Sequence, residues 1–303
     1  MRKITITQDI QEKYKNLVFG IFKDHRLEKK QDKKIIFSIT IETIDKLLQK
    51  KLKHFDKNIT FEKLVLADFE YIKNLTEFID THSSIALNKK EKSYFLTLYE
   101  RLKKTEYIKM LPVTTCLYCN RNYIFNFRKN RQLEATAQLD HFFNKKTYPY
   151  LAISLYNLIP CCSTCNQRKS TKKANIIHPF VESFDDVAKF RLDIKDSRFY
   201  HSVDGLDIEL HTDNPKAQNS IDVFNLDRLY QNHKDIILEL IQKDMIYNDS
   251  YIDELYKNYE GTLFRNREDL ERLISGGFIQ DDEINKRPLS KLIKDISQEL
   301  GLT

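Results

Sequence analysis

The stretch Asn157-Leu-Ile-Pro-Cys161-Cys162-Ser-Thr-Cys165-Asn166-Gln-Arg-Lys169 decides how this chain is organised, together with the earlier Cys116-Leu-Tyr-Cys119. These two stretches hold all five cysteines of the 303 residues. Two Cys-x-x-Cys pairs indicate a tetrahedral structural zinc site, whereas structural disulfides are typical of exported proteins. We therefore expect Cys116, Cys119, Cys162 and Cys165 to bind one zinc ion. Cys161 is the alternative to Cys162, but its spacing from Cys165 matches the first pair less well.

Positive charge is concentrated around the same cysteines. Residues 116–175 contain ten Lys or Arg and two acidic residues, a net charge of +8, whereas the whole chain carries +6. The ten basic residues are Arg121, Arg128, Lys129, Arg131, Lys145, Lys146, Arg168, Lys169, Lys172 and Lys173. Such a region is typical of a face that binds a polyanion. A solvated, lysine-rich surface is the alternative explanation.

Five polar residues lie between and beside the cysteines: Asp140, His141, Asn157, Asn166 and Lys169. Four of them, Asp140, His141, Asn166 and Lys169, supply the groups that phosphodiester hydrolysis needs. Carboxylate and amide oxygens bind hard divalent cations. A histidine titrates near neutral pH and can take a proton from water, and a lysine stabilises phosphate oxygens. Each residue also has a structural alternative: a packed histidine, a turn aspartate, an asparagine that caps a turn or a helix, and an exposed lysine.

The motifs Cys116-Leu-Tyr-Cys119, Leu139-Asp140-His141-Phe-Phe143, Tyr148-Pro149 and Asn157–Lys169 resemble those of bacterial HNH endonucleases with a four-cysteine zinc knuckle. The resemblance implies a small ββα-metal core. It implies a catalytic Mg²⁺ or Mn²⁺ held by Asp140 and Asn166, with His141 as the general base. Asn157 would hold the catalytic loop. The zinc would be structural, because four thiolates leave no open position for water.

The resemblance also gives expectations for residues around this set. It implies contacts with phosphate from Lys169 and Lys173, and the basic region adds Lys145, Lys146 and Arg168 as expected contacts with nucleic acid. His178 would either support the site or pack. Relatives often have proline where this chain has Asn144, which predicts a slightly looser loop after His141.

Hydrophobic periodicity predicts a mainly α-helical fold around this core. Apolar residues recur at helical spacing over 41–55, 61–79 and 90–110, and few glycines or prolines interrupt them. We expect a helical region at 1–110, an HNH nuclease core with zinc knuckles at 111–180, and a hairpin plus helices at 181–303. Inside the core, strands are expected at 123–127 and 133–139, with Asp140 on the polar side of a strand end, followed by a helix over 166–173.

The sequence thus predicts a metal-dependent endonuclease that hydrolyses DNA. The resemblance implies a bacterial antiphage-defence effector beside an ATPase or reverse-transcriptase partner. A zinc-stabilised nucleic-acid-binding module without catalysis and an RNA-cleaving toxin nuclease remain alternatives. The longest apolar runs fall short of the roughly 18 residues of a membrane helix, and the first residues do not resemble a signal peptide. We therefore expect a cytoplasmic protein.

Overall fold

The computed structural model describes residues 1–22, 26–31, 34–130, 132–171 and 174–302. Its contacts divide the chain into two compact units, each assembled from separated segments. The N-terminal unit consists of Ile4–Pro112 and Asn126–Pro160. The C-terminal unit consists of Met1–Lys3, Val113–Phe125 and Cys161–Thr303. The three-part division at residues 110 and 180 stays a prediction.

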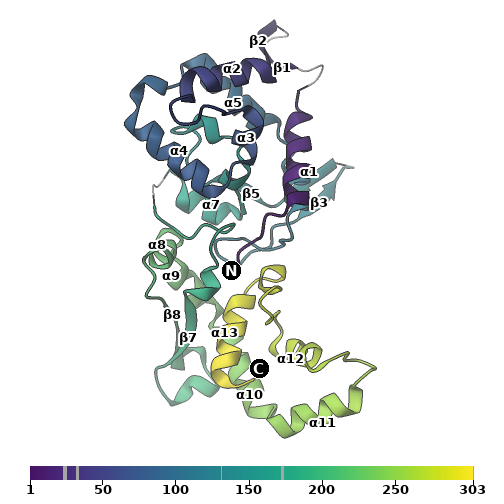
Figure 1. The fold of residues 1–303 in the computed structure, drawn as a ribbon. Coiled ribbons are helices and arrows are strands. Elements are labelled where there is room, and N and C mark those ends of the chain that lie inside the picture. The colour runs from purple at the N-terminus through teal and green to yellow at the C-terminus, as the bar shows by residue number, and fades with distance from the viewer. Residues whose placement is uncertain (23–25, 32–33, 131, 172–173, 303) are drawn as a thin grey trace. The chain divides into compact units, whose positions relative to one another are not determined.

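Helices dominate the N-terminal unit, and short antiparallel strand pairs complete it (Figure 1). Its helices are α1 (Gln8–Phe19), α2 (Ile41–Leu52), α3 (Phe61–Leu66), α4 (Phe69–Thr81), α5 (Lys89–Arg101) and α6 (Lys104–Met110), with 3₁₀ turns η1 (Ser83–Ile85), η2 (Pro149–Leu151) and η3 (Leu155–Asn157). Strand β1 (Arg26–Gln31) pairs with β2 (Lys34–Thr40), which corrects the expectation of an all-helical first hundred residues. The sequence of β2 is rich in β-branched residues, which favour a paired strand.

Two of the predicted helical stretches are each divided in two. The stretch 61–79 breaks before α4, because the side chain of Asp68 caps that helix by accepting a hydrogen bond from the Tyr71 backbone N–H (2.8 Å). The stretch 90–110 breaks at Leu102 and Lys103, between α5 and α6. The helical class of both stretches was predicted correctly, but Asp68 was not recognised as the residue that begins a second helix.

Strands around the predicted core lie a few residues away from their expected positions. Strand β3 (Asn126–Lys129) pairs with β4 (Gln132–Ala135), and β5 (Gln138–His141) pairs with β6 (Leu158–Cys161). The predicted strand 133–139 is therefore two strands with different partners. The alternation of apolar and polar residues continues through both, so the sequence pattern does not reveal the change of partner.

Buried tyrosines of the helices fix the segment that carries β5 and β6. Tyr14 of α1 donates its hydroxyl hydrogen to the Ile153 carbonyl oxygen (2.8 Å), and Tyr107 of α6 donates to the Leu158 carbonyl oxygen (2.8 Å). Both side chains are fully buried. Each hydroxyl thereby satisfies a buried carbonyl, and the helices gain a fixed alignment with the polar segment.

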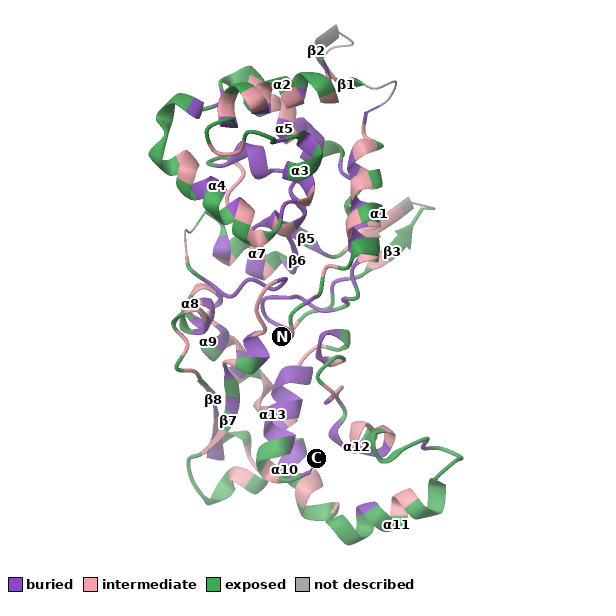
Figure 2. Ribbon diagram, viewed as in Figure 1, coloured by how far each residue is buried: buried purple, intermediate pink, exposed green. Residues whose placement is uncertain are grey.

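Helices and one hairpin make up most of the C-terminal unit. Its helices are α7 (Ser163–Lys169), α8 (Pro215–Phe224), α9 (Leu226–Tyr230), α10 (Lys234–Ile246), α11 (Asp249–Tyr259), α12 (Arg267–Ser275) and α13 (Ser290–Leu300), with 3₁₀ turns η4 (Phe184–Asp186), η5 (Ser197–Tyr200), η6 (Val203–Gly205), η7 (Gln231–His233) and η8 (Ile284–Lys286). The predicted hairpin is formed by β7 (Lys189–Ile194) and β8 (Leu206–His211). Helix α13 packs on β7 and α10 and is buried over most of its length (Figure 2).

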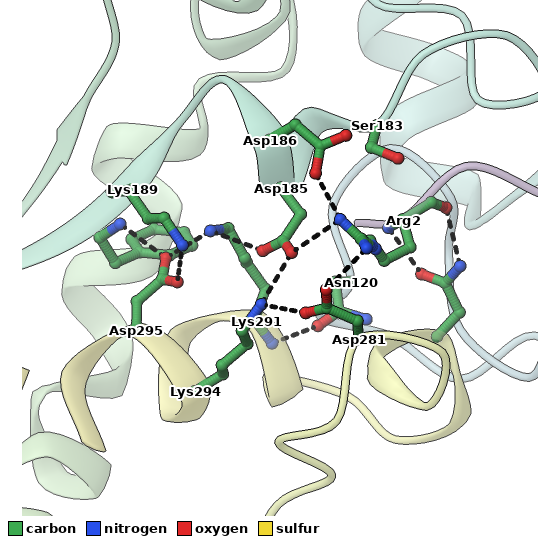
Figure 3. A network of polar contacts seen from close by, with 12 residues as sticks. Arg2, Asn120, Ser183, Asp185, Asp186, Lys189, Asp281, Lys291, Lys294 and Asp295 are labelled. Atoms are coloured by element: carbon green, nitrogen blue, oxygen red, sulfur yellow. Dashed lines mark hydrogen bonds and ion pairs between the residues drawn. The ribbon is translucent and has the colours of Figure 1, made fainter. Parts of the chain in front are cut away.

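A buried network of charges joins α13 to the first residues of the chain (Figure 3). Lys291, whose side chain is 0% exposed, contacts the carboxylates of Asp185 (2.8 Å) and Asp295 (2.6 Å). Asp295 also accepts a hydrogen bond from the Phe190 backbone N–H (2.8 Å) in β7. Arg2 pairs with Asp281 (2.6 Å) at the edge of the network. Helix α13 is therefore held by paired charges as well as by apolar packing.

Candidate functional site

Four buried cysteines form a compact cluster in the C-terminal unit. The sulfur atoms of Cys116, Cys119, Cys162 and Cys165 all lie within 4.8 Å of one another. The Sγ atoms of Cys119 and Cys162 are 3.9 Å apart. A tetrahedral zinc site with Zn–S bonds of about 2.3 Å has edges of about 3.8 Å between sulfurs. The cluster therefore has the size and ligand set of a structural zinc site, and it contains Cys162 rather than Cys161, as predicted.

The protonation of the thiols responds to their mutual contacts. Hydrogen bonds from Cys116, Cys119 and Cys165 lower the pKa of Cys162, whereas burial raises the pKa of Cys116. Backbone N–H groups also reach the sulfurs: that of Cys162 donates to Cys116 Sγ (3.3 Å) and that of Arg121 donates to Cys119 Sγ (3.4 Å). Such donors stabilise thiolates, which are the form that binds zinc.

Asn120 follows the first cysteine pair, Cys116-Leu-Tyr-Cys119 (the first knuckle), and connects it to residues near the end of the chain. Its φ of 50° places the backbone in the left-handed region, and its N–H donates to the Cys116 carbonyl oxygen (2.8 Å). Its fully buried amide donates to the Ile284 carbonyl oxygen (3.0 Å) and accepts from the Lys291 backbone N–H (3.1 Å). Asn120 was not among the predicted site residues, although an asparagine directly after Cys-x-x-Cys is a recognisable signal for a left-handed turn.

Asp140 and His141 lie side by side on strand β5 in the N-terminal unit, and both are buried, at 3% and 8% exposure. Asp140 lies near the end of the strand, on the side of the polar Gln138, as expected, but it is buried rather than exposed to solvent. The imidazole Nε2 of His141 lies 3.1 Å from the Ala152 carbonyl oxygen. A carbonyl only accepts, so this contact assigns the proton to Nε2, and Nδ1 is the basic nitrogen of the neutral ring.

Asn157 ties together both ends of the loop that follows His141. Its Oδ1 accepts a hydrogen bond from the Phe143 backbone N–H (2.6 Å). Its Nδ2 donates to the carbonyl oxygens of Phe143 (3.0 Å) and Leu151 (2.8 Å). The side chain is fully buried. It therefore holds the loop 143–151, which leads to Ala152, the acceptor of the His141 imidazole.

Asn144 forms a polar turn within this loop. Its side chain accepts a hydrogen bond from the Lys146 backbone N–H (2.8 Å), and its carbonyl oxygen accepts from Thr147 (3.1 Å) and Tyr148 (2.8 Å). These contacts form a tight polar turn. The loop is held by these hydrogen bonds, and the expectation of a slightly looser loop after His141 stays a prediction.

Asn166 and Lys169 lie on α7 in the C-terminal unit. The helix begins after Cys162, which is its N-cap residue, so the alternative that Asn166 caps the helix was wrong. Lys169 is buried, at 3% exposure, rather than exposed, and Arg168 is half-buried. Lys173 lies outside the described residues, and α7 ends before it. The short helix over 166–173 was thus correct in kind and shifted by about one turn.

Lys145 lies close to the histidine in the N-terminal unit, whereas Lys146 is exposed. The Lys145 ammonium is 3.9 Å from the centre of the Tyr99 ring, and this ring meets the His141 imidazole edge-on with 4.4 Å between ring centroids. Tyr99 belongs to α5, in a region where the sequence suggested only core packing. The structure thus brings Asp140, His141, Asn157 and Lys145 together in one unit.

His178 has a local structural contact. Its Nδ1 accepts a hydrogen bond from the Phe180 backbone N–H (3.2 Å), and its ring is 1% exposed. This contact matches the packing alternative given for His178. Asn166, Lys169 and the four cysteines belong to the C-terminal unit.

Comparisons with known proteins give one partial match. The chain is 32% identical over 95 residues to the Septu protein PtuB of Bacillus thuringiensis. The match covers 30% of this chain and 31% of that protein, so the chain spans less than a third of its relative. No family model and no solved structure matches. Among the described residues, the helices are too short or too polar to cross a membrane. The chain is therefore similar to a Septu protein over part of its length.

Proposed function

We propose that this chain is a metal-dependent HNH-type endonuclease that hydrolyses phosphodiester bonds of DNA. The observation that supports the proposal is the orientation of His141: the Ala152 carbonyl fixes the proton on Nε2 (3.1 Å), which makes Nδ1 the nitrogen able to accept a proton. The neighbouring Asp140 adds a carboxylate on the same strand. A base and a metal-binding carboxylate in adjacent positions fit the reaction of the HNH endonucleases that the sequence resembles.

In the proposed reaction, Nδ1 of His141 takes a proton from the attacking water as its oxygen bonds to phosphorus and the bond to the leaving oxygen breaks. Asn157 would keep the loop, and with it the imidazole, in position through its contacts with Phe143 and Leu151. Asp140 would hold Mg²⁺ or Mn²⁺, which supplies positive charge against the phosphate when bound. Asn166 as a second ligand and Lys169 as a phosphate contact remain predictions.

We further propose a role in antiphage defence, supported by the similarity to the Septu protein. Septu is a bacterial defence system, so a defence-system partner, such as an ATPase, fits this role. A reverse transcriptase is the other partner that the resemblance suggests. The four-cysteine cluster would hold a structural zinc ion and would take no part in the reaction.

The test is cleavage of supercoiled plasmid with Mg²⁺ or Mn²⁺ by the wild-type chain and by His141→Ala, with zinc measured in both. We expect the wild type to cut, the variant to lose at least about 100-fold in rate, and both to retain zinc. Single-stranded DNA and RNA are tested in parallel. If neither protein cuts any of these substrates although both bind them, the non-catalytic binding module replaces the nuclease. Cleavage of RNA but not of DNA would favour the alternative of an RNA-cleaving toxin nuclease.

A further inference from the structure

Two lysines from distant parts of the sequence converge on one aromatic ring beside His141. The ammonium of Lys145, in the loop after β5, is 3.9 Å from the centre of the Tyr99 ring. The ammonium of Lys104, in the first turn of α6, is 5.0 Å from the same centre. Both lie within the distance at which an aromatic ring attracts a cation. Helices α5 and α6 and the loop after β5 thus contribute to one local cluster.

The ring itself is held firmly. Tyr99 is 8% exposed, its hydroxyl lies 3.4 Å from the Leu139 carbonyl oxygen, and its ring meets the His141 ring in an edge-to-face arrangement with 4.4 Å between centroids. Each ammonium therefore lies no farther from the centre of the imidazole than its own distance to the Tyr99 ring centre plus the distance between the two ring centres. The two positive charges are therefore held near the histidine by a fixed support.

The ring attracts the lysines without neutralising them. An aromatic face has a quadrupole and no net charge, so the ring attracts the two ammonium groups without cancelling their charge. Burial, and next to it the charge of Lys104, lowers the pKa of Lys145, while Glu100 acts in the opposite direction. Two like charges at one ring repel each other, and an anion bound near both would relieve this repulsion.

We propose that Tyr99, Lys104 and Lys145 form a phosphate-binding platform that holds a backbone phosphate of the nucleic-acid substrate beside His141. This inference rests on the proposed function and extends it, because it assigns binding residues to the helical N-terminal region. Lysine contacts with phosphate do not distinguish bases, so the platform binds substrates independently of their sequence. It positions the strand, and His141 performs the chemistry.

The test measures binding separately from cleavage. Fluorescein-labelled single-stranded and duplex DNA oligonucleotides of several sequences are titrated with protein in Ca²⁺, and fluorescence anisotropy is followed over a range of salt concentrations. The variants are Lys104→Ala, Lys145→Ala and Lys145→Arg, the last of which retains the charge. Lys103→Ala is the matched control, because Lys103 adjoins Lys104 but pairs with Glu106 (3.0 Å). Circular dichroism checks that each variant is folded.

Each alanine variant should weaken binding several-fold for every sequence. Each should also reduce the slope of log affinity against log salt by about 0.7 on single strands or about 0.9 on duplexes. Lys103→Ala should match the wild type, and Lys145→Arg should keep the wild-type slope because it retains the positive charge. The platform is refuted if the wild type binds and Lys104→Ala and Lys145→Ala have the same slope as Lys103→Ala.

The two proposals can fail separately in this design. If the slopes change as expected but no substrate is cut under any metal, the platform stands and the nuclease proposal fails. If the wild type cuts and the slopes are unchanged, the nuclease stands and the platform fails. A wild type that neither binds nor cuts refutes both.

Discussion

Replacing Asn157 tests whether one buried amide holds the loop beside His141. The side chain is fully buried and makes three hydrogen bonds, two to Phe143 and one to the carbonyl oxygen of Leu151. Asn157→Ala removes all three. Leu151 is itself fully buried, so its carbonyl oxygen would lose a partner where water has little access.

The expected cost follows from these contacts. The two bonds to the half-buried Phe143 contribute about 1 kcal/mol each, and the abandoned Leu151 carbonyl adds about 1–3 kcal/mol. We expect the loop to open more easily by about 3–5 kcal/mol in total. A difference of this size corresponds to at least about a 100-fold increase in the opening constant.

Hydrogen–deuterium exchange followed by mass spectrometry measures this locally. Exchange is compared for peptides that cover residues 142–152, and peptides from α8 serve as an internal reference. A local measurement suits a chain with two compact units, because global unfolding need not be a single transition. Cleavage by Asn157→Ala should fall together with the protection of the loop if the amide positions the imidazole.

Asn157→Asp separates the donor role from the acceptor role. A carboxylate can still accept from Phe143, but it faces the carbonyl oxygens of Phe143 and Leu151 without a hydrogen to donate. Its pKa should therefore be raised in the folded state, so the variant gains stability as the pH falls. Loop protection in Asn157→Ala within threefold of the wild type would refute this account.

Three further predictions concern the C-terminal unit. Cys119→Ser should lose bound zinc and destabilise this unit, whereas Cys161→Ser should retain one zinc per chain, as measured by metal analysis of purified protein. Asp295→Ala removes a partner from the fully buried Lys291, so it should lower the free energy of unfolding in urea by about 3–5 kcal/mol. The side chain of Asp186 is 59% exposed, so Asp186→Ala should lower it by less than about 1 kcal/mol. Burial alone would raise the pKa of Asp185, but the neighbouring lysines more than offset it and lower the pKa. The stability that Asp185 adds is therefore present above pH about 4 and lost progressively below it, which a pH series of unfolding curves would reveal.

Much of the candidate site could be predicted from residue spacing alone. Two Cys-x-x-Cys pairs predicted the four-cysteine cluster, and the same spacing selected Cys162 over Cys161. Metal ligands leave such a clear pattern because a tetrahedral site needs particular side chains at short, fixed separations. The adjacency of Asp140 and His141 was equally visible in the sequence.

The support around the histidine could not be predicted in the same way. Tyr99 and Lys104 come from helices whose apolar stripes suggested only core, and they meet Lys145 about forty residues later in the chain. The burial of Asp140 was also missed, because alternation along one strand does not show which element covers its second face.

The sequence by itself thus determined the helical class, the cysteine cluster and the chemical groups of the proposed site, because these depend on residue type and local spacing. The tertiary structure alone decided that the chain divides into two units of separated segments and that His141 presents Nδ1 as its basic nitrogen. It also decided that Asn120 links a knuckle to α13. These features depend on contacts between residues far apart in the chain, for which a single sequence has no periodic signal.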